Sequence, residues 1–194
     1  MPKDGVHVRE GSPADFPALS RIDGSLSTDW VLHIERRGSP TEQTLQFTWR
    51  QVKAAGSKRR IDTAESLEEL QTEWKRSDRL LIAEVDGAAV GCLMLGENWN
   101  KTAELTLIIV DSAHRRRGIG RRFVQEAAAY ARKRALRALQ WEAQNDNREA
   151  IEFGLSQGFR IAGFHDALYR KDDLARQDAP DFRGIALFLT KTLE

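Results

Sequence analysis

The chain has 194 residues, of which 41% are hydrophobic and 8% aromatic, so it can form one domain with a sizeable core, and a disordered chain is excluded. Lys and Arg number 30 against 29 Asp and Glu, a net charge of +1, which leaves no overall basic field to attract nucleic acid or an anionic membrane. A single cysteine, Cys92, excludes an internal disulfide. With no signal-peptide or membrane-length apolar run, we expect a cytoplasmic protein.

Short elements fill the first 78 residues. They are recognised by alternating polarity in strands, by Ser as a helix cap and by Gly and Pro in turns. In chain order we predict a strand at 6–9, a helix that begins at Ser12-Pro13 and reaches Ile22, a hairpin with arms at 30–38 and 45–52 around Gly38-Ser39-Pro40, a mobile loop at 53–65 and a helix capped by Ser66.

The rest of the chain alternates strands with two long helices. Asp86-Gly87 between two apolar runs is a strong hairpin signal, and Gly158 is suited to end a helix. We predict strands at 79–85 and 88–95, a turn at 98–101, a strand at 105–110, a helix after Gly120, a strand within 136–143, a helix at 147–157, and strands at 159–164 and 185–193 joined by a polar linker. An antiparallel meander followed by β–α–β–α–β predicts a single mixed α/β domain over 1–194.

Residues 105–120, LTLIIVDSAHRRRGIG, carry the strongest functional signal. An apolar run typical of a strand buried on both faces leads through a polar turn and three arginines to Gly118-Ile119-Gly120, where an amphipathic helix begins. Unpaired N–H groups at a helix start favour an anion, glycine lets a phosphate approach the backbone, and arginines bind its oxygens. The pattern predicts a phosphorylated cofactor. A basic patch that is merely solvated or binds nucleic acid is the alternative.

Arg115-x-x-Gly118-x-Gly120 after a buried strand resembles the acyl-CoA-binding signature of the GCN5-related N-acetyltransferases, the GNAT superfamily. A second block of that family, an asparagine-led helix that ends in Gly-Phe, has its counterpart at 147–159. The chain is most similar to the streptothricin acetyltransferase branch, in Asn98-Trp99-Asn100, in the phrase at 142–147 and in the C-terminal tail. The resemblance implies a mostly antiparallel central sheet flanked by helices, and acetyl-CoA as the cofactor. It places the cofactor core at about 79–164 and implies that residues 1–78 help form the acceptor site.

The resemblance also implies which residues bind acetyl-CoA. In such enzymes the central strand separates from its neighbour after a bulge, and freed main-chain groups bind the pantetheine arm. The arginine- and glycine-rich loop surrounds the pyrophosphate, and the asparagine-led helix lies near the thioester. The implied cofactor-binding residues are Ile108, Ile109, Val110, Arg115, Arg116, Arg117, Gly118, Ile119, Gly120, Arg121, Asn147 and Ala150.

Acetyl transfer needs a neutral amine, although a lysine-type amine has a pKa near ~10.4. A carboxylate can take that proton, and Glu104 matches the catalytic glutamate of the histone-acetyltransferase members; it could equally be a strand-end charge. The streptothricin branch has acidic residues where this chain has Thr106 and Leu107. The tyrosine that many members use as an acid for the leaving thiolate is replaced by Gly154, so Tyr169 or a water is the candidate substitute.

We therefore expect transfer of acetyl from acetyl-CoA to a primary amine of a small, antibiotic-like molecule by direct attack in a ternary complex. A peptide or protein amine, or a non-catalytic acyl-CoA sensor, is the alternative. A homodimer stays open, and neither nucleic acid nor a membrane is expected as a partner. No metal is expected, because the histidines lack ligand spacing. Trp30, Trp49 and Trp99 either line an acceptor pocket or simply pack.

Overall fold

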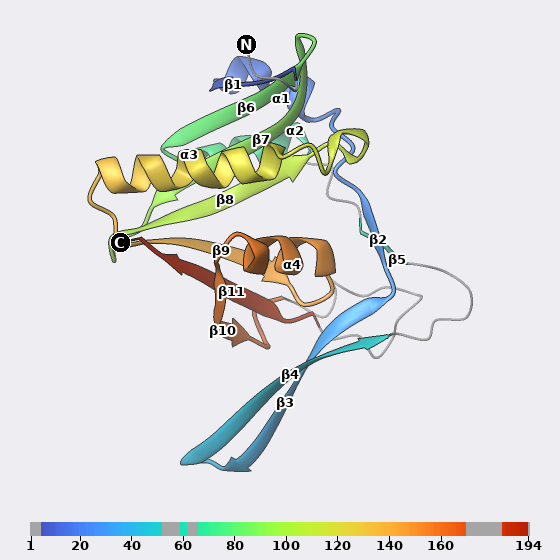
Figure 1. The fold of residues 1–194 in the computed structure, drawn as a ribbon, viewed down its shortest axis with the longest axis vertical. Helices are drawn as coiled ribbons and strands as arrows, with labels where there is room; N and C mark the ends of the chain where they lie inside the picture. Colours follow the sequence, from blue (N-terminus) through green and yellow to red (C-terminus); the bar gives the residue numbers. More distant parts are fainter. Residues whose placement is uncertain (1–4, 52–58, 62–65, 170–183, 194) are drawn as a thin grey trace.

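The computed structural model describes residues 5–51, 59–61, 66–169 and 184–193. Its centre is a seven-stranded sheet of order β1-β6-β7-β8-β9-β11-β10 (Figure 1). Only β8 and β9 are parallel; the other neighbours are antiparallel, which confirms the predicted mixed sheet. The strands are β1 (Val6–Glu10), β6 (Arg79–Val85), β7 (Ala88–Glu97), β8 (Thr102–Val110), β9 (Ala138–Gln144), β10 (Arg160–His165) and β11 (Ala186–Thr192).

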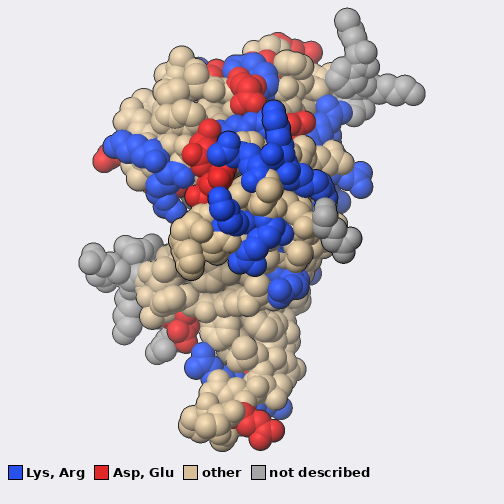
Figure 2. All heavy atoms as spheres, turned by 90° about the vertical axis from the view of Figure 1, so that its left-hand side faces the viewer, with Lys and Arg blue, Asp and Glu red and all other residues tan. Residues whose placement is uncertain are grey.

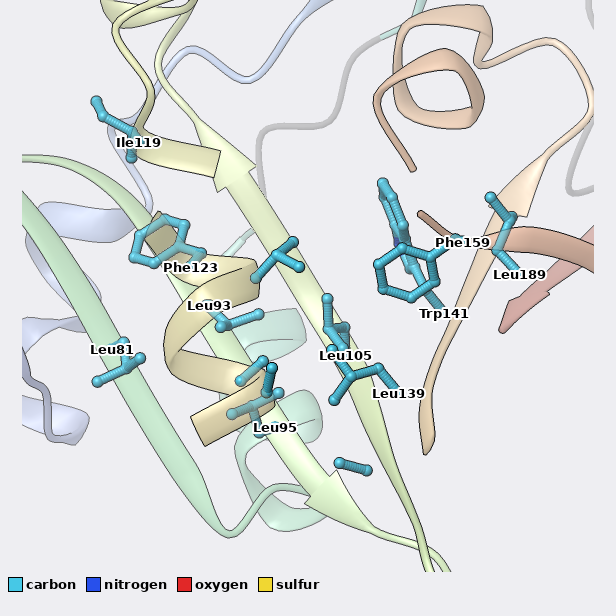
Figure 3. Close-up of a cluster of buried hydrophobic side chains, with 14 of the residues drawn as sticks. Leu81, Leu93, Leu95, Leu105, Ile119, Phe123, Leu139, Trp141, Phe159 and Leu189 are labelled. Atoms are coloured by element: carbon cyan, nitrogen blue, oxygen red, sulfur yellow. The ribbon is translucent and has the colours of Figure 1, made fainter. Parts of the chain in front are cut away.

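Helices cover both faces of this sheet. One face carries α3 (Ile119–Lys133) and α4 (Arg148–Ser156), and the other carries α1 (Phe16–Leu19) and α2 (Leu67–Lys75). Figure 3 shows the core between the sheet and the helices α3 and α4, to which Phe123 of α3 and Leu93 of β7 both belong. In the same core, Trp141 and Phe159 meet edge-to-face with centroids 6.1 Å apart. Each such fully buried side chain contributes about 1.5–3 kcal/mol. No helix within the described ranges is long and apolar enough to cross a membrane.

Turns and caps form where the sequence predicts them. Asp86 and Gly87 both have positive φ, 50° and 78°, as a tight two-residue hairpin turn requires. Ser66 caps α2, accepting from the N–H of Glu69 at 3.2 Å, while Glu69 accepts in return from the N–H of Ser66. Gly158, at φ 86°, ends α4. The first predicted helix is shorter than expected, a 3₁₀ turn and then α1, because Pro13 and Pro17 remove two N–H donors.

The two predicted hairpin arms are confirmed as a ribbon of β3 (Trp30–Ser39) and β4 (Glu42–Gln51), which extends away from the body (Figure 1). The turn lies at Pro40-Thr41 and not at the predicted Gly38-Ser39-Pro40, because Gly38 and Ser39 still pair with β4. Its base is fixed to the end of β9, where Leu32 donates its N–H to Asn145 O at 2.7 Å and Asn145 Nδ2 donates to Leu32 O. The predicted loop at 53–65 was wrong in part. Residues 59–61 form β5 (Arg59–Ile61), because they pair with β2 (Leu26–Thr28). The remainder of the predicted loop lies outside the described residues, as does most of the predicted linker before β11.

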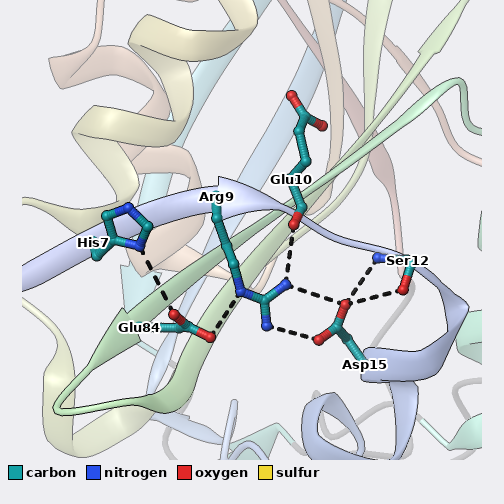
Figure 4. A network of polar contacts seen from close by, with 6 residues as sticks. All are labelled: His7, Arg9, Glu10, Ser12, Asp15 and Glu84. Atoms are coloured by element: carbon teal, nitrogen blue, oxygen red, sulfur yellow. Dashed lines mark hydrogen bonds and ion pairs between the residues drawn. The ribbon is translucent and has the colours of Figure 1, made fainter.

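A polar network fastens the first helical turn to the sheet edge (Figure 4). Arg9 on β1 donates to Asp15 at 2.7 Å and to Glu84 on β6 at 2.8 Å, and it also reaches the carbonyl of Glu10. The hydrogen bond from Arg9 holds the pKa of the Asp15 carboxyl below its usual value, and the N–H of Ser12 adds to the effect. Asp15 is therefore ionised and paired at neutral pH.

Candidate active site

An opening in the middle of the sheet is the central feature of the site. Strands β8 and β9 pair from Thr102↔Ala138 to Leu105↔Trp141 and no further, although both strands continue. Figure 1 shows them diverging. On its other side, β8 pairs Leu105 with Leu95 and Leu107 with Met94, so Thr106 is the extra residue of a bulge. A bulge bends its strand, and this one lies where β8 leaves β9.

The pattern of hydrogen bonds between β7 and β8 shows which main-chain groups of β8 face this opening. Asp111 N–H donates to Val90 O at 2.9 Å, and the pairing of β7 with β8 then alternates residue by residue. The N–H and C=O groups of Ile108 and Val110 consequently face the opening. Those of Ile109 face β7, and its side chain is buried on the face of α1 and α2. Of the three predicted cofactor residues on this strand, the geometry favours Ile108 and Val110 and not Ile109.

The two glycines after β8 are required at their positions for different physical reasons. Gly118 has φ 81°, and a Cβ placed on it would have nothing within 4 Å, so its conformation requires glycine and its surroundings are open. Gly120 lies in the first turn of α3, and a Cβ there would be 2.9 Å from Phe153 Cζ. The first N–H groups of α3, from Ile119 onward, have no acceptor within the helix. This open, donor-rich helix start fits a pyrophosphate.

Arg115 supports the loop from within the protein. Its guanidinium donates to Gly24 O at 2.7 Å, to Val110 O at 3.3 Å and to Glu149 on α4 at 3.3 Å. Arg115 thus ties the end of β8 to the segment before β2 and to α4. Exposed arginines follow it at the helix start, namely Arg116, Arg117 and Arg121.

Basic and acidic side chains are mixed on one face of the described part of the molecule. On the face drawn in Figure 2, the Lys and Arg side chains of the upper half have acidic side chains among them. Arg79 pairs with Glu10 at 2.6 Å, and Arg134 pairs with Glu97. Mixed charges of this kind weaken a one-sided field over this face.

Helix α4 carries the second predicted block. Asn147 caps it, its Oδ1 accepting from the N–H of Ala150 at 3.0 Å. Gly154 faces the sheet, where a Cβ would be 2.8 Å from Leu189 Cδ2 and 3.1 Å from Trp141 Cζ3. At the position where the family resemblance expects a tyrosine, even a Cβ would therefore require Leu189 and Trp141 to shift.

A tyrosine–carboxylate pair lies beside the opening. Tyr169, which follows β10, donates its O–H to Glu142 on β9. Burial raises the pKa of Glu142 and the Glu104 charge raises it further, against the opposing effect of the Tyr169 bond. Burial and the bond to Glu142 raise the pKa of Tyr169 strongly. The hydroxyl proton of Tyr169 is thus directed at Glu142, which makes it a poor source of a proton for a thiolate.

Glu142 was not predicted as a site residue. The sequence contains a signal for it, because Gln140, Glu142 and Gln144 alternate with buried apolar residues along β9 and share one face. Glu104 lies opposite Gln140 and so belongs to the same face. That signal could not show which of the two glutamates lies at the opening.

The three tryptophans considered as candidates for an acceptor pocket, Trp30, Trp49 and Trp99, fall into two groups. Arg148 lies over Trp30 and Trp49, with its Cζ 4.7 and 5.3 Å from their ring centroids, and so joins the ribbon to the start of α4. Trp99 is 95% exposed in the turn between β7 and β8, at the end of β8 remote from the opening.

Cys92 is buried in the core. Among the residues that the structure describes, none form a metal-binding group.

Comparison with known proteins bears directly on this arrangement. The profile of the Acetyltransferase (GNAT) family matches residues 45–159. A streptothricin acetyltransferase of Streptomyces lavendulae is 30% identical over 167 residues, covering 84% of this chain and 85% of its own. The crystal structure of nourseothricin acetyltransferase superposes with a TM-score of 0.75 at 25% identity, covering 98% of this chain and 99% of its own.

The fold also matches a Bacillus anthracis protein, provisionally named a streptothricin acetyltransferase, whose structure contains acetyl coenzyme A. Its TM-score is 0.76 at 23% identity, and the match covers 97% of this chain and 99% of the other.

Proposed function

Because the chain belongs to the acetyltransferase (GNAT) family and is an acetyl-CoA-dependent N-acetyltransferase, we propose that its acceptor is a primary amine of a small cationic molecule. The amine would attack directly, in a ternary complex with the cofactor. The observation that carries this proposal is the opening between β8 and β9, which has main-chain amides of β8 on one side and the half-buried Glu142 beside it.

The cofactor residues follow from the same geometry. Acetyl-CoA supplies an acetyl thioester that an amine can attack. Main-chain groups of Ile108 and Val110 would pair with the amides of the pantetheine arm, as a neighbouring strand would. The N–H groups at the start of α3, with the arginines beside them, would bind the pyrophosphate. Asn147 would lie near the thioester at the start of α4.

The carboxylate beside the opening supports a cationic acceptor. An ammonium group must lose a proton before it attacks, and a carboxylate beside the opening can accept it. Glu104 is the residue that family resemblance nominates. The Streptomyces lavendulae relative, which is named a streptothricin acetyltransferase, supports a small-molecule amine over a protein. We also propose that residues 1–78 contribute a wall of the acceptor site through the tryptophans at the base of the ribbon.

The test is release of CoA thiol from acetyl-CoA with a panel of amines: streptothricin, a polyamine, lysine amide and a peptide with a free N-terminus. We expect turnover to be highest with a small cationic amine, and mass spectrometry should find one added acetyl group. Preference for the peptide would replace the small-molecule acceptor by a protein one. Tight acetyl-CoA binding in calorimetry with no turnover on any amine would favour the sensor.

A further inference from the structure

Two glutamates, Glu104 and Glu142, lie on the face of the sheet opposite α3 and α4, and the end of strand pairing distinguishes them. Glu104 is paired on both sides, with Gly96 on β7 and Gln140 on β9, so it lies where the sheet is still closed. Glu142 is the first residue of β9 after the last pair with β8, Leu105↔Trp141. Its side chain therefore lies at the point where the opening begins.

Tyr169 holds Glu142 in place. The pair joins β9 to the segment after β10, and both side chains are half-buried. A carboxylate with one oxygen fixed by a phenol keeps its remaining acceptor capacity for another donor. The groups that act on Glu142 are Tyr169 and, through its charge, Glu104; Asp146 and Gln144 act on Tyr169. Tyr169 therefore orients a partly desolvated Glu142 carboxylate at the edge of the opening between β8 and β9.

We propose that Glu142, and not Glu104, takes the proton from the acceptor ammonium, and that Tyr169 is a positioning residue for Glu142 and not the acid for the leaving thiolate. This inference rests on the proposed function and names the residues that carry it out. Glu104 then acts as a neighbouring charge that makes Glu142 more basic and favours a cationic acceptor at the same place.

The proton and electron balance is complete with these groups. One proton passes from the ammonium nitrogen to the Glu142 carboxylate, and the nitrogen lone pair attacks the thioester carbonyl carbon. The C–N bond forms and the C–S bond breaks, with its electron pair leaving on sulfur. The second nitrogen proton neutralises the thiolate, and Glu142 releases its proton to solvent. A CoA-type thiol with a pKa of about 8.5 is a tolerable leaving group without a dedicated acid, consistent with the absence of a side chain at Gly154.

The pH dependence of kcat/KM tests the assignment, using the panel amine with the highest wild-type turnover. Activity requires ionised Glu142, so the rate rises as pH rises through its pKa and defines an acid limb. Tyr169→Phe removes a bond that lowers this pKa, so the limb should move to higher pH. Glu104→Gln removes a charge that raises it, so the limb should move to lower pH. Glu142→Gln should lower kcat by about 10²–10⁴-fold and abolish the limb.

The controls separate a chemical role from a structural one. Acetyl-CoA affinity in calorimetry should be unchanged in Glu142→Gln and Tyr169→Phe. Neither residue belongs to β8 or to the start of α3, the two elements assigned to the cofactor. Glu126→Gln, on an exposed face of α3, serves as the matched glutamate variant and should behave as wild type. Loss of the limb in Glu104→Gln, or its retention in Glu142→Gln, would overturn the inference while leaving the proposed function intact. A wild type that acetylates no amine would instead contradict the proposed function.

Discussion

Substitution of Gly118 separates the stability of the phosphate loop from its function. At φ 81°, an L-residue costs roughly 1–2 kcal/mol, and the open space around the missing Cβ adds no clash. Gly118→Ala should therefore lower the free energy of unfolding by about that amount. In Gly118→Glu, a negative charge next to the N-terminus of α3 recovers about 0.3–1 kcal/mol through the helix dipole. The glutamate variant should thus be at least as stable as the alanine variant.

Acetyl-CoA binding should rank the two variants in the opposite order. A carboxylate about 5 Å from a phosphate charge, at an effective dielectric constant of about 20, costs roughly 3 kcal/mol, which corresponds to about two orders of magnitude in Kd. Urea unfolding followed by tryptophan fluorescence gives the stabilities, and calorimetry at low and high salt gives the affinities. The deficit of Gly118→Glu relative to Gly118→Ala should shrink at high salt, because the repulsion is screened.

The alanine variant is the control for backbone strain, which both substitutions share. Equal acetyl-CoA affinity of Gly118→Ala and Gly118→Glu would show that no phosphate lies near residue 118. The assignment of the start of α3 to the pyrophosphate would then be wrong, whatever the stabilities.

Two further predictions concern packing and pH. Gly154→Ala should destabilise the protein by about 1–3 kcal/mol from overpacking against Leu189 and Trp141, less up to about 1 kcal/mol gained in helix propensity; a thermal midpoint at or above that of the wild type would contradict the close contact. Arg9→Met should cost about 1 kcal/mol near neutral pH, because both partners are partly exposed. Asp15 has a lowered pKa when folded, so its contribution is present above its unfolded pKa and is lost as pH falls through the folded pKa. Urea unfolding at several pH values should show the gap between wild type and Arg9→Met closing in acid, and a constant gap would count against the pair.

Much of the local structure at the proposed cofactor site can be predicted from sequence because its determinants are local. The strand, the positive-φ glycine and the helix start follow one another within residues 105–120, and each has its own signal in composition or spacing. The bulge has none. Leu105-Thr106-Leu107 reads as an uninterrupted strand, and only the pairing with β7 shows that Thr106 is the extra residue. Which amides face the opening depends on that single residue, and this is why Ile109 could not be separated from its neighbours.

The acceptor half depends on contacts between distant parts of the chain. Tyr169 and Glu142 are 27 residues apart, and no spacing rule joins a tyrosine after one strand to a glutamate on another. Glycine has a similar ambiguity: Gly118, Gly120 and Gly154 look alike in sequence, yet the first is required by its backbone angle and the others by close neighbours. At Gly154 this difference decides the chemistry. If the position were open, its glycine would be a lost acid that a mutation could restore. Because Trp141 and Leu189 occupy the space, residue 154 offers no room for an acid beside the thiolate, and in the proposed reaction the thiolate takes its proton from the acceptor nitrogen.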